Sequence, residues 1–202
     1  MNEFLSDSVL HNLEIAGTLV GLVYIYLQYK ASSRLWIANM LMSCIYIVIY
    51  MSEGIYAQCG INIYYVLAAI YGLLVWKFSK KPEEKEKPIT SVAKKTLFIS
   101  LASSVFICAS LISILYMLSG QESLTPTILL DGMSTGLSII ALYFLAHKYK
   151  EHWIVWMIVD AFAIALYLIS ELYFTAGLFV LYIVTSVAGY RNWNKLMKDA
   201  KA

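Results

Sequence analysis

The chain has 202 residues, of which 60% are apolar and 14% are charged, and its formal net charge is +2. Its mean hydropathy of +0.70 is high, and average soluble domains have roughly 45–50% apolar and about 25% charged residues. These values exclude a disordered chain, a coiled-coil rod and a soluble enzyme with a charged surface, which leaves an integral membrane protein.

Seven apolar segments have the length and composition to cross a bilayer, whose core of about 30 Å takes about 20 helical residues. Helices are expected because lipid offers no hydrogen-bond partners to an open backbone, and the sequence lacks the two-residue alternation of a β-barrel. In chain order, the predicted spans are residues 9–29, 36–51, 55–78, 96–118, 127–146, 153–169 and 172–191.

The charges between the spans predict the orientation. With seven spans, all 15 Lys and Arg residues fall on one side, in the loops at 30–34, 77–95 and 148–150 or from residue 191 onward. The positive-inside rule therefore places the C-terminus in the cytoplasm and the N-terminus outside.

The sequence also resembles itself at an offset of 117 residues. Trp36 aligns with Trp153 and Trp76 with Trp193, and Gly72 and Gly189 align as well. Such residue types seldom coincide by chance in membrane helices, so two copies of a three-helix module are predicted.

This repeat defines the expected organisation. Residues 9–78 and 127–193 are the two modules, 79–95 a charged cytoplasmic loop, 96–118 a linker helix and 194–202 a cytoplasmic tail. A single linker helix makes the copies parallel, so the expected fold class is an all-α membrane protein with seven transmembrane helices in a 3+1+3 parallel pseudo-repeat. Transporters built in this way hold their substrate between the halves near the midplane.

Polar side chains recur at helical spacing inside the predicted spans. An Asp facing lipid at the bilayer centre costs about 2.5–3.5 kcal/mol, so these faces are expected to point into the bundle. Trp153, Trp156 and Asp160 share one such face. The predicted substrate-binding residues are Trp36, Asn39, Asn62, Tyr65, Asp131, Trp153, Trp156 and Asp160, and Glu14 is predicted to line the entrance.

Structural roles compete with these assignments. An interfacial aromatic belt is the competing explanation for Trp36, Trp76, Trp153 and Trp193, which lie near span ends, and it is favoured for Trp76 and Trp193. Asp160 fits a hydrogen-bonded anchor between helices, as do Asn39 and Asn62. Glu14 and Asp131 fit helix-start caps, and Gly72 and Gly189 fit close helix packing.

A cavity lined by these residues suits a flat molecule that is uncharged or cationic. The chain has 16 Tyr and 5 Trp residues, and aromatic faces stabilise a cation by about 0.5–2 kcal/mol. Because no interior Lys or Arg is expected, a phosphorylated molecule would be excluded. Phosphate-binding loops, hydrolase motifs and paired His/Cys clusters are absent from the sequence, so no enzyme activity, cofactor, metal or nucleic-acid partner is expected.

Several blocks of the sequence together resemble the Pnu vitamin-transporter family over nearly the whole chain. These blocks are Ile55-Tyr56-Ala57-Gln58 with Tyr65, Tyr71-Gly72 and Trp76; Asp131 with Thr135 and Leu137-Ser138; Trp153-Ile154-Val155-Trp156 with Asp160; and Ala188-Gly189-Tyr190-Arg191-Asn192-Trp193. The resemblance implies a SWEET-like fold and a homotrimer embedded in the lipid of the bacterial inner membrane. It also implies facilitated diffusion of a small vitamin without a coupled ion, with uptake driven by phosphorylation in the cytoplasm.

The family includes branches for nicotinamide riboside and for thiamine, both flat cations. Nicotinamide riboside members tend to have Asn where this chain has His152, and Gln in the region of Leu142 and Tyr143. The stretch from Gly60 to Tyr65 looks more like the thiamine branch. Thiamine is therefore the favoured substrate and nicotinamide riboside the alternative, while a SWEET-type sugar uniporter, a non-transporting sensor and a membrane enzyme remain rival hypotheses.

Overall fold

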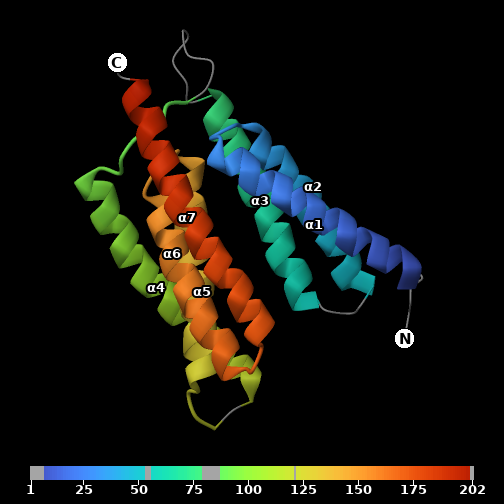
Figure 1. The fold of residues 1–202 in the computed structure, drawn as a ribbon. Helices are drawn as coiled ribbons and strands as arrows, with labels where there is room; N and C mark the ends of the chain where they lie inside the picture. Colours follow the sequence, from blue (N-terminus) through green and yellow to red (C-terminus); the bar gives the residue numbers. More distant parts are fainter. Residues whose placement is uncertain (1–6, 53–55, 79–86, 121, 201–202) are drawn as a thin grey trace. The chain divides into compact units, whose positions relative to one another are not determined.

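A computed structural model describes residues 7–52, 56–78, 87–120 and 122–200 (Figure 1). Residues 79–86 of the predicted charged loop and Ile55 of the family motif lie outside these ranges. All regular elements in the described part are helices: α1 Asp7–Tyr29, α2 Arg34–Ser52, α3 Tyr56–Phe78, α4 Lys94–Ser119, α5 Pro126–Ala146, α6 His152–Ile169 and α7 Tyr173–Asp199.

The predicted spans match these helices within two residues at each end, with one exception. Helix α7 was expected to end at residue 191 but continues to Asp199. Hydropathy marks only the part of a helix that lies in lipid, whereas the hydrogen-bonded helix can extend into water. Buried Trp193 fixes this extension, so the predicted tail from residue 194 is helical over most of its length.

The membrane character of the helices is supported by length and composition. Among the described residues, α1 to α6 each contain a stretch long and apolar enough to cross a bilayer. Large apolar side chains of helix α4 are exposed, among them Phe106 at 75% and Leu118 at 80%. Such exposure is expected for a surface that lipid covers. The seventh span, in α7, stays a prediction.

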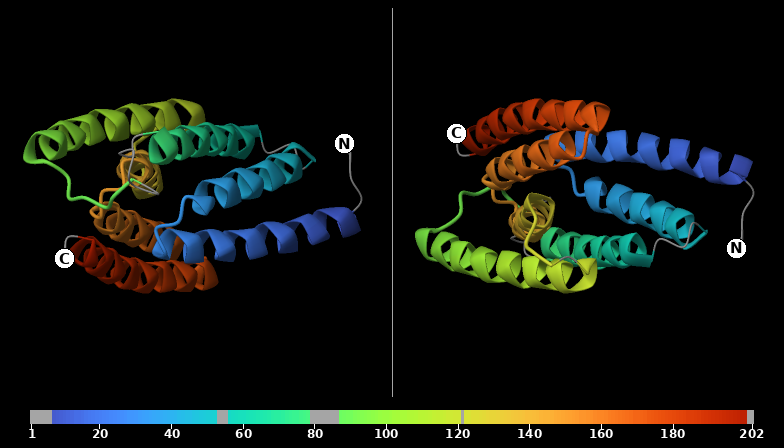
Figure 2. Two further views of the ribbon diagram at one scale, coloured as in Figure 1. Left: turned by 90° about the horizontal axis from the view of Figure 1, so that it is seen from above. Right: turned by 90° about the horizontal axis from the view of Figure 1, so that it is seen from below.

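The chain divides into two compact units, Met1–Pro88 and Ile89–Ala202, whose helices Figure 2 shows from above and below. In the first unit, α2 packs between α1 and α3. In the second, α4 packs on α5, α5 on α6 and α6 on α7. Gly132 and Gly136 bring α4 close to α5, because an added Cβ at Gly136 would lie 2.6 Å from Cys108 Sγ and one at Gly132 would clash with Ile112.

The turns that join α1 to α2 and α5 to α6 have the same backbone pattern. Ala31 and Lys148, 117 residues apart, both adopt a left-handed conformation, with φ of 54° and 59°. The Ala31 N–H donates to the Gln28 carbonyl at 3.0 Å, and the Lys148 N–H donates to the Leu145 carbonyl at 2.9 Å. Both turns therefore reverse the chain in the same way, although their sequences differ.

Candidate substrate-binding site

Each unit contains a pair of perpendicular tryptophans. The rings of Trp36 on α2 and Trp76 on α3 are 5.7 Å apart with an interplanar angle of 88°. Those of Trp153 on α6 and Trp193 on α7 are 6.1 Å apart at 89°. These edge-to-face pairs hold the middle helix of each trio to the next helix along the chain.

Two glycines make room for these rings. A Cβ at Gly189 would lie 2.5 Å from Cε2 of Trp153, and one at Gly72 would clash with the Trp36 ring. The close-packing role predicted for both glycines is confirmed. The four indoles are at most 3% exposed, so the alternative of an aromatic belt, which lies at the lipid interface, is wrong for them.

The polar face predicted on α6 is present. Asp160 is 4% exposed, and Trp156 is half-buried one helical turn before it. The indole N–H groups of Trp153 and Trp156 are buried and have no hydrogen-bond partner among the described residues. The described residues also donate no hydrogen bond to the Asp160 carboxyl. Two free donors and a free acceptor therefore follow one face of α6.

On the corresponding face of α2, the buried indole N–H of Trp36 likewise has no partner among the described residues, whereas Asn39 and Ser43 bond to each other. Ser43 Oγ donates a hydrogen bond to Asn39 Oδ1 at 3.4 Å, and both side chains are buried. On α3, Asn62 is 7% exposed and Tyr65 is half-buried, with its ring 5.8 Å from that of Tyr64. Burial and polarity fit both a ligand contact and interhelical bonding for Asn39 and Asn62.

The acidic residues near the outer ends do not cap their helices. Thr125 is the N-cap of α5, where its hydroxyl accepts from the Ile128 N–H at 3.3 Å. Asp131 lies farther inside the helix and accepts from the Thr135 hydroxyl at 3.4 Å. Glu14 is seven residues into α1, exposed and 3.9 Å from the His11 ring. The helix-start alternative is therefore wrong for both residues.

Sequence reasoning missed the environment of His152. Its ring is fully buried between Trp153, at 4.6 Å, and Trp193, at 4.4 Å. Its Nδ1–H donates to the Tyr149 carbonyl at 2.8 Å, and Nε2 has no partner within the described chain. The 117-residue repeat could have indicated this burial, because it aligns His152 with the apolar Leu35. Leu35 is also 0% exposed.

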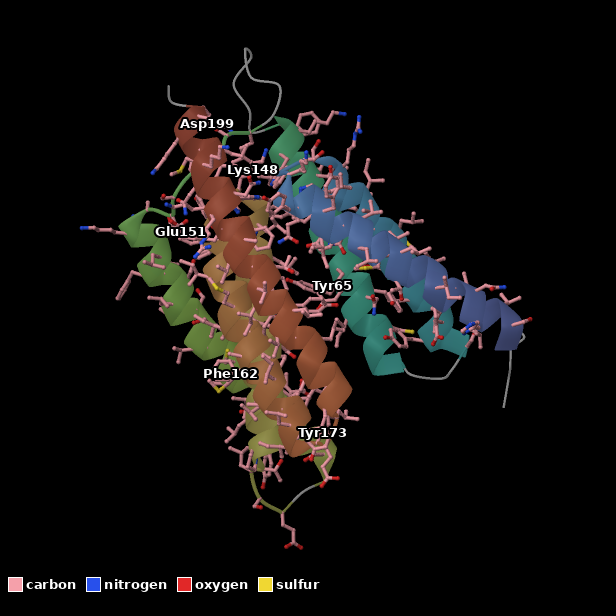
Figure 3. The ribbon with its side chains drawn as sticks, in the orientation of Figure 1. Tyr65, Lys148, Glu151, Phe162, Tyr173 and Asp199 are labelled. Carbon is pink, nitrogen blue, oxygen red and sulfur yellow. The ribbon has the colours of Figure 1, made fainter. Side chains whose placement is uncertain are left out.

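One cation also departs from expectation. Lys148 is 3% exposed, although no interior Lys or Arg was predicted. It lies in the α5–α6 turn, and Figure 3 shows Lys148 and Glu151 toward the same end of the second unit as Asp199, with Phe162 and Tyr173 toward the other. This buried charge is therefore at a helix end and not within a span.

The first unit thus holds Glu14, Trp36, Asn39, Asn62 and Tyr65, and the second holds Asp131, Trp153, Trp156 and Asp160. The structure brings the last three together on α6, and Trp36 with Asn39 on α2. That all of them touch one substrate stays a prediction. Among the described residues, no group of three His, Cys, Asp or Glu side chains could hold a metal ion.

Comparisons with known proteins give relatives over almost the full chain. The nicotinamide riboside transporter PnuC of Neisseria mucosa is 24% identical over 199 residues, covering 92% of this chain and 73% of the relative. The transporter of the same name from Escherichia coli is 21% identical and covers 90% and 84%. A crystal structure of the vitamin B3 transporter PnuC has a TM-score of 0.67 at 23% identity, covering 97% and 85% of the two chains.

These relatives are named as nicotinamide riboside transporters, so the expected placement nearer to the thiamine branch is not supported. The Pnu resemblance itself is confirmed by the family model, which is described as nicotinamide mononucleotide transporter and matches residues 11–195. With nearly the whole sequence matched and the fold shared, this chain belongs to the nicotinamide mononucleotide transporter family, the PnuC family of membrane vitamin transporters.

Proposed function

We propose that this protein carries nicotinamide riboside across the bacterial inner membrane by facilitated diffusion, without a coupled ion. The observation that carries the proposal is the face of α6 on which two unpartnered indole donors accompany a buried carboxyl. The names of the relatives supply the substrate class. Phosphorylation of the riboside in the cytoplasm drives net uptake.

Nicotinamide riboside matches this face group by group. Its pyridinium ring is a flat cation, which stacks on an aromatic ring such as that of half-buried Trp156. Its carboxamide and ribose oxygens accept hydrogen bonds from the free Nε1–H groups of Trp153 and Trp156. Its ribose hydroxyls donate to the Asp160 carboxyl, and that carboxyl in its ionised form attracts the positive pyridinium.

The same charges discriminate against the phosphorylated nucleotide. A phosphate group near Asp160 would meet a like charge in a medium of low dielectric. Lys148, the buried cation of the described chain, lies in a turn and not in a span. Nicotinamide mononucleotide is therefore a poor substrate, which is the property that keeps the phosphorylated product inside the cell.

We also infer that residues 9–78 and 127–193 are parallel repeats joined by α4. The tryptophan pairs and the Ala31 and Lys148 turns, each pair of features related by 117 residues, support this arrangement. Rocking of one repeat against the other moves the substrate from the outer to the inner side. The N-terminus outside, the cytoplasmic C-terminus and the homotrimer complete the proposal.

Uptake into proteoliposomes that contain a riboside kinase and ATP tests this function. We expect labelled nicotinamide riboside to accumulate, and Trp156→Ala and Asp160→Asn each to weaken apparent affinity roughly tenfold through lost stacking and a lost charge-assisted bond. Phe106→Ala, on an exposed face of α4, and Asp199→Asn, at the end of α7, are the matched controls and should transport normally.

The rival functions give different results in the same assay. Accumulation of thiamine in preference to the riboside, with a thiamine kinase enclosed, would restore the thiamine assignment. Flux of uncharged sugars would favour the SWEET-type uniporter, and tight binding without flux a sensor. A requirement for a proton or sodium gradient would overturn the uniport mechanism.

A further inference from the structure

The first unit has an apolar groove on its surface that the proposed transport does not use. It lies along α1 and α2 and has a volume of about 440 Å³. Leu19 and Val23 of α1 and Ile37 and Leu41 of α2 form its walls, with buried Ala38 between them. Each wall side chain is more than half exposed, so the groove is open over its length.

A positively charged side chain, that of Arg34, lies at the end of this groove next to the α1–α2 turn. Arg34, the first residue of α2, lines the groove, and its side chain is exposed. Within the described residues, no salt bridge involves Arg34. Lys30 lies in the same turn with its Nζ 5.5 Å from the centroid of the exposed Tyr26 ring. Because this turn ends two membrane spans, its cations lie at the level of lipid headgroups.

The second unit shows what covers the equivalent face there. Val23 is 52% exposed, but Ile140, 117 residues later, is only 8% exposed because α4 packs on α5. The residue aligned with Arg34 is Glu151, which accepts a hydrogen bond from the Val92 N–H just before α4, at 3.0 Å. Within the first unit, helix α1 packs on α2.

The groove is not shaped for a helix like α4. Close approach of α4 depends on Gly136, where a Cβ would lie 2.6 Å from Cys108 Sγ. The aligned residue of α1 is Leu19, which is 58% exposed and keeps a second helix at a distance. A flexible hydrocarbon chain adapts to such a wall, and a guanidinium binds a phosphate through two parallel hydrogen bonds.

We propose that the α1–α2 groove binds an anionic phospholipid, with one acyl chain between Leu19, Val23, Ile37 and Leu41 and the phosphate on Arg34. The acyl chain of such a lipid matches the apolar walls of the groove, and its negative phosphate matches the positive charge of Arg34. Basic pockets between transmembrane helices on the cytoplasmic side bind anionic headgroups in other membrane proteins.

Native mass spectrometry of the full-length protein in detergent tests this site. Phosphatidylglycerol and phosphatidylcholine with identical acyl chains are the probes, and glycerol 3-phosphate tests the headgroup alone. We expect phosphatidylglycerol to be retained, to lose roughly five-fold in apparent affinity in Arg34→Gln, and to keep its affinity in the matched control Arg191→Gln. Val23→Trp, which fills the groove, should reduce retention of both lipids.

Folding is checked by the lipid-free melting temperature of each variant, which these exposed positions should leave unchanged. Equal retention of the two lipids, or an equal loss in both arginine variants, would overturn the proposal. Retention of glycerol 3-phosphate as strong as that of the lipid would identify a phosphate site instead. A changed oligomeric mass in Val23→Trp would show that a second copy of the chain fills the groove.

Discussion

At the scale of single residues, the clearest dependence is that of two indoles on two glycines. We predict that Gly72→Ala and Gly189→Ala each lower the free energy of unfolding by about 1–3 kcal/mol, the usual cost of overpacking a core. The new methyl groups would meet the Trp36 and Trp153 rings, which have no space to move because Trp76 and Trp193 pack against them. Thermal unfolding in detergent measures the effect.

The same helices supply the controls. Gly60 on α3 and Gly177 on α7 have no atom within 4 Å of an added Cβ. Their alanine variants should be neutral or more stable by up to about 1 kcal/mol, since Ala is the better helix former. If all four substitutions had the same effect, helix propensity would explain the result and the packing argument would fail.

The second prediction at this scale concerns His152. We predict that His152→Leu changes stability by no more than about 1 kcal/mol and leaves the preference between nicotinamide riboside and thiamine unchanged. The bond from Nδ1 to the Tyr149 carbonyl is lost, which costs about 0.5–1.5 kcal/mol, but the unpartnered Nε2 is also removed.

Competition uptake with both vitamins measures the preference. The argument rests on the packing of the ring, which the indoles of Trp153 and Trp193 enclose at 4.6 and 4.4 Å. A reversal of preference in His152→Leu would show that the side chain contacts the substrate after all. This burial also explains why residue 152 misled the prediction of the substrate branch, since the sequence shows the identity of a side chain but not its surroundings.

At the scale of elements, the entry of the chain into α4 depends on the α5–α6 turn. The Thr90 N–H donates to the Lys148 carbonyl at 3.1 Å, the Lys150 N–H donates to the Thr90 carbonyl at 3.0 Å, and the Val92 N–H donates to the Glu151 carboxylate. We predict that Glu151→Ala speeds exchange of the Val92 amide hydrogen roughly two- to tenfold, the equivalent of one lost hydrogen bond.

Amide hydrogen exchange followed by mass spectrometry resolves this segment. Glu151→Gln is the matched control, because its amide oxygen still accepts from Val92 while the charge is gone, and its exchange should lie between those of the wild type and Glu151→Ala. Unchanged exchange in Glu151→Ala would mean that the hydrogen bond does not hold the segment in solution.

The elements themselves could be predicted closely because hydropathy reports directly on the surroundings of a membrane helix. The start of α6 was placed within one residue, whereas the end of α7 was missed because its last turns carry polar side chains. The contact of α4 with α5 was also missed. It depends on Gly132 and Gly136, and the sequence alone does not show which helix lies opposite a small residue.

At the scale of the whole molecule, the candidate site was also predicted only in part. The periodicity correctly placed Trp153, Trp156 and Asp160 on one helix face. The periodicity could not predict that the two tryptophans differ in burial. Trp153 packs against Trp193 and is 3% exposed, whereas Trp156 is half-buried. Residue spacing gives the direction of a side chain from its own helix, whereas burial depends on the neighbours that the fold supplies.

The orientation of the molecule yields the last prediction. In a variant whose three cysteines are replaced by Ala, a membrane-impermeant maleimide should label Ser8→Cys and Glu122→Cys in intact cells, and label Lys198→Cys only after permeabilisation. With seven spans, all 15 Lys and Arg would lie on the side of the C-terminus, and the reverse orientation would move every one of them across the membrane. Equal labelling of Ser8→Cys and Lys198→Cys from outside would put both ends on one side. Two three-helix repeats joined by one helix could then not run in parallel, and the transport mechanism that depends on them would fail.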